Sequence, residues 1–179
     1  MVYGTLWPTQ DGWANMARYA GPAGESWSYQ KVNLAAHERA RLTAGDVLPV
    51  FEVPGLDAAL GVQLCRDLRF PEQWQALCRR GAQVLCFLTN ATNPRDRYDV
   101  WRTHLISRAA ENQRWVISAN VASPQQCSPS MIVAPSGEVV SECPNGASTV
   151  ITASIDPSAI SDWYLSQARA DVVEVSYKR

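Results

Sequence analysis

The sequence feature that most constrains the fold is a strand, a helix and a second strand in close succession. Two apolar runs, residues 58–65 and 82–89, have the length and the composition of strands. Pro71 suits the first position of a helix between them, and Gly81 suits its end. The second run is almost continuously apolar, as is typical of a strand covered on both faces. The pattern predicts a buried sheet with a helix packed against it.

Other elements follow from the same kinds of pattern. Apolar residues recur at helical spacing from Tyr98 to Ala109 and predict a second helix. Residues 29–46 have poor periodicity and are expected to form a long ordered loop, while Asp156 and Pro157 are expected to begin a last helix. Apolar runs between turn residues predict further strands at residues 2–7, 13–20, 48–53, 115–121 and 147–155, and a hairpin at residues 130–142.

These elements predict one α/β domain over residues 1–179, with a mixed sheet and helices on one of its faces. The other face is apolar as well, so it must also be covered. With 46% apolar and 18% charged residues, the chain is expected to be globular rather than disordered. A net charge of −1, with acids and bases interspersed, gives no electrostatic reason to expect nucleic acid or an anionic membrane as a partner.

The five cysteines are an odd number without a CxxC pair, and the two histidines lie far apart. Zinc-binding spacing is therefore absent, and we expect neither a metal nor another cofactor. No apolar run approaches the length of a membrane span, and the sequence does not open with a basic segment followed by an apolar core. Because free thiols fit a reducing compartment, we predict a cytoplasmic protein.

Cys65 differs from the other cysteines in its position. It ends an apolar run and is followed by a polar turn that leads to the helix beginning near Pro71. Ligands bind at strand ends in α/β sheets, and backbone amides near a helix start favour a thiolate and a developing oxyanion. The residues alone leave two interpretations, a nucleophile or a buried core thiol. A structural role is expected for Cys78, Cys86, Cys127 and Cys143.

A cysteine nucleophile usually works with a base, most often a histidine. His104 is predicted to lie in the middle of a helix, where packing or a surface hydrogen bond is the expected role. His37 lies beside Glu38 in the loop and is expected to face solvent. The other route is a carboxylate base, with the ammonium group of Lys31 holding the thiolate and the oxyanion. Most lysines, however, are solvated surface charges.

Several stretches, taken together and in order, resemble the carbon–nitrogen hydrolase (nitrilase) superfamily. They are YQKVNL at residues 29–34 with Glu38 after it, GVQLCRDLRFPE at residues 61–72, the Gly81-Ala82 pair, RAAEN at residues 108–112, Asn120, and IVAPSG at residues 132–137. The resemblance covers nearly the whole chain and is closest to the small-amidase branch that includes omega-amidases. It implies an α-β-β-α sandwich, of which this chain would form a part.

The resemblance also implies roles for individual residues. Cys65 would be the nucleophile, Lys31 would stabilise the tetrahedral intermediate, and the backbone N–H of Arg66 would be a second oxyanion donor. Glu38 would orient the lysine or assist proton transfer. The implied reaction is attack on an amide or nitrile carbon, formation of a thioester with loss of ammonia, and hydrolysis of the thioester by water.

The RFPE variant of the motif is most similar to amidases that act on the ω-amides of dicarboxylic acids. Arg69 would then bind the substrate carboxylate, or it forms a salt bridge with Asp67 or Glu72. Asn90 either lines the pocket or forms the turn in the stretch TNATNP. Helical spacing predicts a buried structural network formed by Arg108, Glu111 and Asn112.

One part of the family pattern has no counterpart. The general base of the family is a glutamate that ends an early strand, well before the lysine. The acids upstream of Lys31 are Asp11 and Glu25, and neither lies in an apolar strand followed by a turn. The chain is therefore expected to lack the first strands and helices of the family together with the base.

Two hypotheses of different class follow, an amidase represented by part of its domain or a non-catalytic remnant that keeps a binding pocket or an oligomer interface. A thiol-redox protein is disfavoured, because no second cysteine lies near Cys65 in the sequence. Exposed apolar surface and sheet edges, together with the paired subunits common in the resembling family, predict a homodimer or a higher homo-oligomer. The other expected partner is a small amide substrate.

Overall fold

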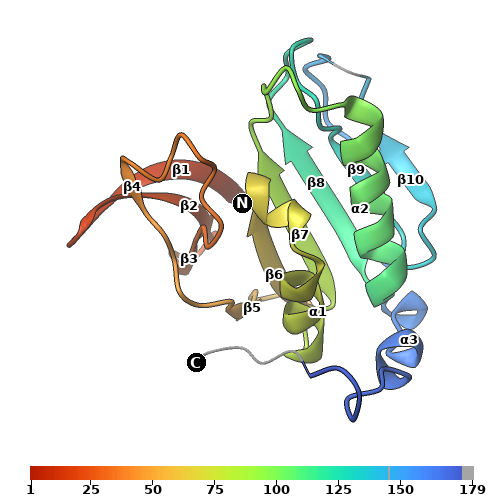
Figure 1. Cartoon of the computed structure of the whole chain (residues 1–179). Helices are drawn as coiled ribbons and strands as arrows, with labels where there is room; N and C mark the ends of the chain where they lie inside the picture. The colour runs from red at the N-terminus through yellow and green to blue at the C-terminus, as the bar shows by residue number, and fades with distance from the viewer. Residues whose placement is uncertain (145, 175–179) are drawn as a thin grey trace.

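The strands form two sheets in the computed structural model, which describes residues 1–144 and 146–174 (Figure 1). In the first sheet, β1 and β3 are antiparallel to the central β2, and the short β4 pairs with β2 in parallel. Its strands are β1 (Val2–Thr9), β2 (Gly12–Ala20), β3 (Ser26–Gln30) and β4 (Leu42–Thr43). The second sheet has the order β10-β9-β8-β7-β6-β5. Its strands are β5 (Val50–Glu52), β6 (Ala59–Leu64), β7 (Val84–Thr89), β8 (Trp115–Asn120), β9 (Met131–Val133) and β10 (Val139–Glu142).

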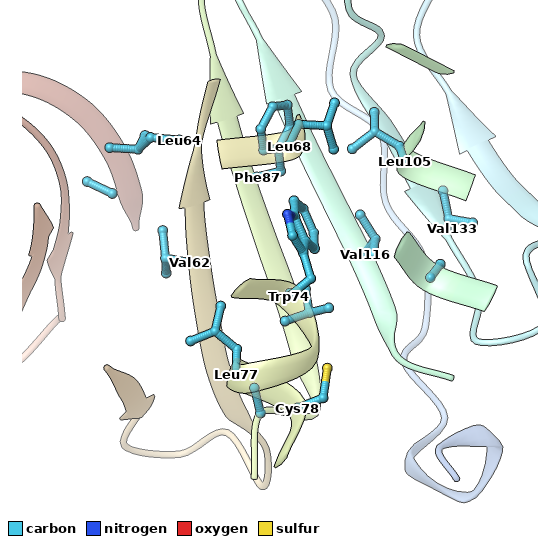
Figure 2. Close-up of a cluster of buried hydrophobic side chains, with 14 of the residues drawn as sticks. Val62, Leu64, Leu68, Trp74, Leu77, Cys78, Phe87, Leu105, Val116 and Val133 are labelled. Carbon is cyan, nitrogen blue, oxygen red and sulfur yellow. The ribbon is translucent and has the colours of Figure 1, made fainter. Parts of the chain in front are cut away.

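Two α-helices lie on one face of the six-stranded sheet, as the sequence predicted (Figures 1 and 2). They are α1 (Pro71–Arg79) and α2 (Tyr98–Asn112). A 3₁₀ helix, η1 (Cys65–Arg69), connects β6 to α1, and η2 (Pro157–Ala159) and α3 (Trp163–Ser166) lie near the end of the described chain. The predicted boundaries of α1 are confirmed, because Pro71 occupies its first turn and Gly81 follows it with φ at 98°, a backbone conformation that glycine adopts without strain.

The centre of the second sheet is parallel. β6 pairs with β7 and β7 pairs with β8 in parallel, whereas β5 and β9 are antiparallel to their neighbours. The register places Leu64 opposite Leu88, and Thr89 opposite Asn120. The carboxyl ends of three adjacent strands therefore meet at one edge, which is where ligands bind in sheets of this kind.

The core between the sheet and the helices is built around three aromatic rings. Trp74 of α1, Phe87 of β7 and Trp101 of α2 follow one another at centroid distances of 5.9 and 6.2 Å. All three are fully buried, as are Leu77 and Leu105 from the same helices. Figure 2 shows Trp74, Phe87 and the two leucines in this layer. Burying a side chain of this size contributes about 1.5–3 kcal/mol, so this layer holds α1 and α2 against the sheet.

The opposite face of the sheet is covered by two different parts of the chain. At the β6 side, Val62 and Leu64 share a buried cluster with Ala17 of β2 and Tyr29 of β3, so the first sheet packs there. Farther along, a second cluster of Leu60, Val84, Trp115 and Ile132 is contacted by partly buried apolar residues of the last described segment, which include Ile151, Ala153, Ile155 and Ile160. The expectation that this apolar face is covered is thus met.

The prediction of a strand at residues 147–155 is wrong. This segment pairs with no strand, although its apolar side chains alternate in the way that the prediction used. Ile151, Ala153 and Ile155 contact the sheet while Val150 is 86% exposed. The chain lies across the face of the sheet rather than along its edge, so the alternation reflects one-sided burial without a hydrogen-bond ladder.

The other differences are smaller. The predicted last helix is only the single turn of η2, capped by Asp156, followed by the four residues of α3. The expected loop at residues 29–46 begins inside β3 and contains β4. Within the described ranges, no helix has the combination of length and apolar character needed to cross a membrane.

Candidate active site

A cavity of about 530 Å³ opens at the carboxyl ends of β6, β7 and β8. Cys65 lies in its wall, directly after the last residue of β6. The end of β7, the end of β8 and one side of β1 complete the lining. Three asparagines, Asn15, Asn90 and Asn120, are among the residues that line this otherwise largely apolar space. Cys65 thus follows the end of a strand, as the sequence predicted, and the structure has a cavity at that point.

Cys65 has an unusual backbone conformation. Its φ is 46°, in the left-handed region that residues other than glycine rarely adopt. The turn occurs because the chain leaves the extended β6 and enters η1 at once, without a loop. Such conformations cost of order 1–3 kcal/mol and persist where the surrounding structure fixes them, which is common at active sites. Arg66 is the second residue of η1, where backbone N–H groups have no partner inside the helix.

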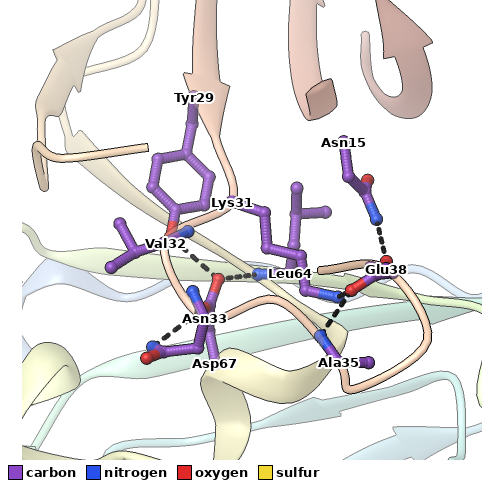
Figure 3. A network of polar contacts seen from close by, with 9 residues as sticks. All are labelled: Asn15, Tyr29, Lys31, Val32, Asn33, Ala35, Glu38, Leu64 and Asp67. Atoms are coloured by element: carbon purple, nitrogen blue, oxygen red, sulfur yellow. Dashed lines mark hydrogen bonds and ion pairs between the residues drawn. The ribbon is translucent and has the colours of Figure 1, made fainter. Parts of the chain in front are cut away.

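Lys31 is buried and paired with Glu38. Its Nζ donates to Glu38 Oε2 over 2.6 Å, and none of the lysine surface is exposed. Glu38 Oε2 also accepts from the backbone N–H of Ala35 over 2.6 Å, and Oε1 accepts from Asn15 over 2.9 Å (Figure 3). Because Asn15 also lines the cavity, one hydrogen bond separates this ion pair from the cavity wall.

The Glu38 carboxylate is held in its charged form. Burial alone would raise its pKa, but the hydrogen bonds from Lys31, the Ala35 amide and Asn15 outweigh this effect and lower the pKa below its usual value. Both oxygens are occupied by donors. This arrangement suits a residue that orients Lys31, and it is poorly suited to one that accepts a proton during the reaction.

The lysine loop and the cysteine turn are joined by a buried carboxylate that the sequence analysis did not select. Asp67 of η1 accepts hydrogen bonds from Tyr29 and Asn33, which flank Lys31, and from the backbone N–H of Leu64 (Figure 3). A local signal exists, since the aspartate lies two residues after Cys65. Its partners Tyr29 and Asn33 lie more than 30 residues away in the chain, so spacing alone could not identify them.

Arg69 is engaged in contacts within the protein. Its Nη2 donates to Asp96 over 3.1 Å, its Nη1 lies 3.2 Å from His104 Nε2, and its guanidinium stands over the ring of Trp101. The sequence analysis gave a salt bridge with Asp67 as one alternative role of Arg69, but the Asp67 carboxylate accepts hydrogen bonds from other donors. A role for Arg69 toward a substrate carboxylate stays a prediction.

The remaining predicted residues are placed as follows. Asn90 lines the cavity, and its Oδ1 accepts from Gln126 over 2.8 Å. The predicted helical network is present, because Arg108 donates to Glu111 over 2.6 Å and to the carbonyl oxygen of Leu68, and Asn112 donates to the carbonyl of Arg108. Arg108 and Asn112 are buried as predicted, but Glu111 is exposed. It ties α2 to η1 and so supports the turn that carries Cys65.

The two acids that precede Lys31 lie at the tips of hairpins. Asp11 is exposed in the turn between β1 and β2, and Glu25 is partly exposed just before β3, where it caps its own turn. The described residues that line the cavity include no aspartate and no glutamate.

The pH dependence of stability should report on the contact between His104 and Arg69. Burial, followed by the charges of Arg69 and Arg108, lowers the pKa of His104. The folded state then binds fewer protons than the unfolded state, so this residue makes the free energy of unfolding rise with pH up to about 6.5, the ordinary histidine pKa, and adds no slope above it. Urea unfolding of the wild type and of His104→Gln should show this slope only in the wild type. His37→Gln, at an exposed position, is the control, and an equal slope in both variants would contradict the assignment.

Comparison with known proteins places the chain in a family. A model of the carbon-nitrogen hydrolases matches residues 7–164. An omega-amidase from Xenopus tropicalis is 33% identical over 140 residues, which are 75% of this chain and 48% of that protein. A 2-oxoglutaramate amidase from Bacillus subtilis is 35% identical over 120 residues, or 64% of this chain and 45% of that protein. The chain thus spans about half the length of the curated relatives it matches.

The fold is also similar to that of a solved structure. An amidase from Nesterenkonia sp. AN1 is 26% identical and superimposes with a TM-score of 0.79, covering 96% of this chain and 67% of that one. This similarity confirms the predicted nitrilase-type α/β fold. Because the family model covers most of the sequence, the chain belongs to the carbon–nitrogen hydrolase family.

Proposed function

We propose that this chain carries the nucleophile and the oxyanion-binding groups of an amidase that acts on small amides. The observation that carries the proposal is the position of Cys65, held at positive φ in the wall of a cavity at three strand ends. The thiolate attacks the amide carbon, and the ammonium group of Lys31 and the N–H of Arg66 stabilise the charge on oxygen. The carbon–nitrogen bond then breaks, the nitrogen takes up a proton to leave as ammonia, and water hydrolyses the thioester.

The relatives support a cysteine nucleophile. One structure of the Nesterenkonia amidase, a variant 26% identical to this chain, is described as showing covalent addition of the acetamide moiety of fluoroacetamide at the active-site cysteine. In this chain, Cys65 is the cysteine that lines the cavity. The buried ion pair of Lys31 and Glu38 beside that cavity gives the cation a fixed direction, as oxyanion stabilisation requires.

The substrate class that we favour is an ω-amide of a dicarboxylic acid. Support comes from relatives named omega-amidase and 2-oxoglutaramate amidase. Among the asparagines that line the cavity, Asn90 can offer its amide N–H groups to a carboxylate, whereas Asn15 and Asn120 already donate to Glu38 and to the carbonyl of Ser128. Arg69 could serve the same group only after leaving Asp96. Succinamate should therefore protect Cys65 from alkylation better than butyramide, which has the same chain length without the terminal carboxylate.

The second candidate is a non-catalytic module that keeps the pocket. It is favoured by one observation, the lack of an acidic side chain among the described residues lining the cavity. Such a module would bind the amide without forming a covalent adduct. Detection of an acyl adduct on Cys65 by mass spectrometry would therefore decide between the two.

Cys65 should be the cysteine that brief iodoacetamide treatment modifies first at neutral pH. It is partly exposed in the cavity wall at the end of β6, where a small reagent can reach the sulfur. Burial raises the pKa of Cys78 and of Cys86 to about 12, so these thiols should react slowly, although Cys86 is partly exposed. Peptide mapping checks the order of modification, with Cys65→Ser as the control. Faster labelling of Cys78 or Cys86 would count against the nucleophile assignment.

We also expect the chain to self-associate. Large apolar side chains are exposed on the β1–β2 hairpin, where Leu6, Trp7 and Trp13 are each more than two-fifths exposed. The register pairs Trp13 with Pro8, so Leu6 and Trp13 share one face of the hairpin while Trp7 lies on the other. Exposed apolar groups on a shared face are a common sign of an interface. Light scattering at micromolar concentration should give a mass above that of one chain, whereas a single monomeric species would contradict the expectation.

A further inference from the structure

The carboxylate of Asp67 is completely buried and accepts four hydrogen bonds. Oδ1 accepts from the backbone N–H of Asn33 over 2.9 Å and from its side-chain Nδ2 over 3.0 Å. Oδ2 accepts from the hydroxyl of Tyr29 over 2.8 Å and from the backbone N–H of Leu64 over 3.0 Å. These contacts stabilise the ionised carboxylate, whereas burial acts in the opposite direction more strongly and raises the pKa of Asp67.

The residues that Asp67 binds bracket the two groups of the proposed reaction. Tyr29 lies two residues before Lys31, and Asn33 lies two residues after it. On the other side, Leu64 directly precedes Cys65, and Asp67 itself follows it by two residues. One carboxylate thus contacts residues on both sides of the lysine, through the Tyr29 hydroxyl and the Asn33 backbone N–H, and the residue before the cysteine, through the Leu64 backbone N–H (Figure 3).

The aspartate is itself anchored to the core. Its backbone carbonyl accepts from Trp74 Nε1 over 3.1 Å and from the N–H of Phe70 over 3.2 Å. Trp74 is fully buried in the layer between α1 and the sheet. The carboxylate therefore connects the lysine loop to α1 and β6 through hydrogen bonds on both sides.

Among the described residues, no lysine, arginine or histidine forms an ion pair with Asp67. A buried carboxylate without a cation costs free energy that an apolar residue in the same place would not cost. Hydrogen bonds of fixed direction offset this cost only while all four donors stay in place. The free energy of these hydrogen bonds is thus sensitive to small displacements of the lysine loop or of the cysteine turn. The bonds therefore favour one fixed spacing between the two segments.

We propose that Asp67 is a positioning residue, which together with Tyr29 holds the Lys31 ammonium at the point where the oxyanion forms on the carbon attacked by Cys65. This role rests on the proposed function, because it concerns the same site. A displacement of about 1 Å in such a group can reduce a rate by about 10²-fold. The rate of acylation of Cys65 should therefore depend much more strongly on the contact between Asp67 and Tyr29 than the rate of simple alkylation of the thiol does.

Two reactions of Cys65 separate positioning from stability. Alkylation by iodoacetamide needs an accessible thiolate but forms no oxyanion, whereas acylation by a p-nitrophenyl ester needs the oxyanion donors as well. The quantity to measure is the ratio of the acylation rate to the alkylation rate. Tyr29→Phe should lower this ratio by about tenfold and Asp67→Asn by about 10²-fold, by the same sensitivity to displacement.

Tyr98→Phe is the matched control. It removes a phenol hydroxyl that also donates to a carboxylate over 2.8 Å, that of Glu142, at the start of α2. This variant should be destabilised without a change in the ratio. If Asp67→Asn does not fold, Tyr29→Phe alone carries the test, because it keeps the carboxylate and three of its four donors.

The outcomes distinguish the two proposals. A wild-type chain that is never acylated at Cys65 would overturn the proposed function, and the positioning role with it. A wild-type chain that is acylated, with the ratio unchanged in Tyr29→Phe, would overturn the positioning role and leave the function standing. A ratio that falls equally in Tyr98→Phe would show that the effect is general loss of stability, and would also overturn the positioning role.

Discussion

A p-nitrophenyl ester should acylate Cys65 to about one equivalent per chain, while glutaramate should release ammonia at close to the background rate. The ester has a good leaving group, so its reaction needs only the thiolate and the oxyanion donors. An amide also needs a proton for the departing ammonia, and the thioester needs an activated water. Each such step gains ~10²–10⁴-fold from general acid–base catalysis. No described residue lining the cavity is an acid that could supply it.

The measurement follows the adduct mass and the released nitrophenolate and ammonia together, with Cys65→Ala as the control. We expect a stoichiometric burst of nitrophenolate and a thioester that persists. Rapid release of ammonia, abolished in Cys65→Ala, would contradict the expectation and would show that a carboxylate in the chain serves as the base. Glu38 would then be the first candidate, and Glu38→Gln would test it, even though both of its oxygens are occupied in the structure.

The parts of the fold that the sequence predicted well are those with local signals. Pro71 and Gly81 mark the ends of α1 through their own backbone preferences, which need no information from the rest of the chain. The buried strand β7 is recognisable because both of its faces are covered, so nearly every residue is apolar. Cys65 could be selected because the strand end and the helix start on either side of it are both visible locally.

Features that depend on distant partners could not be predicted in the same way. The segment at residues 147–155 has the alternation of a strand, but alternation records burial on one side and does not require a paired neighbour. Asp67 is an ordinary acid of a polar turn until Tyr29 and Asn33 are brought to it by the fold. The partner of Arg69 likewise comes from the loop before α2, 27 positions along the chain.

The pair of Lys31 and Glu38 should dominate the electrostatic part of the stability. Glu38→Leu leaves the ammonium group of Lys31, a residue with 0% exposure, without an anion beside it. Removing one partner of a buried ion pair lowers the free energy of unfolding by about 3–5 kcal/mol. The double variant Lys31→Met with Glu38→Leu should lose less than the sum of the two single variants, because no charge is then left unpaired. Urea unfolding measures all three.

The exposed pair of Arg97 and Asp99 is the control, since solvent screens it and its removal should leave the stability nearly unchanged. The pH dependence gives an independent check. Because the pKa of Glu38 is lowered on folding from 4.5, its contribution is complete above that pH and disappears as the pH falls through the lower folded value. The difference in stability between the wild type and Glu38→Leu should therefore be constant near neutrality and shrink in acid. If Glu38→Leu lowers the free energy of unfolding no more than removal of the exposed pair does, the buried pair does not hold Lys31 in place. The proposed role of Lys31 toward the oxyanion would then lose its structural basis.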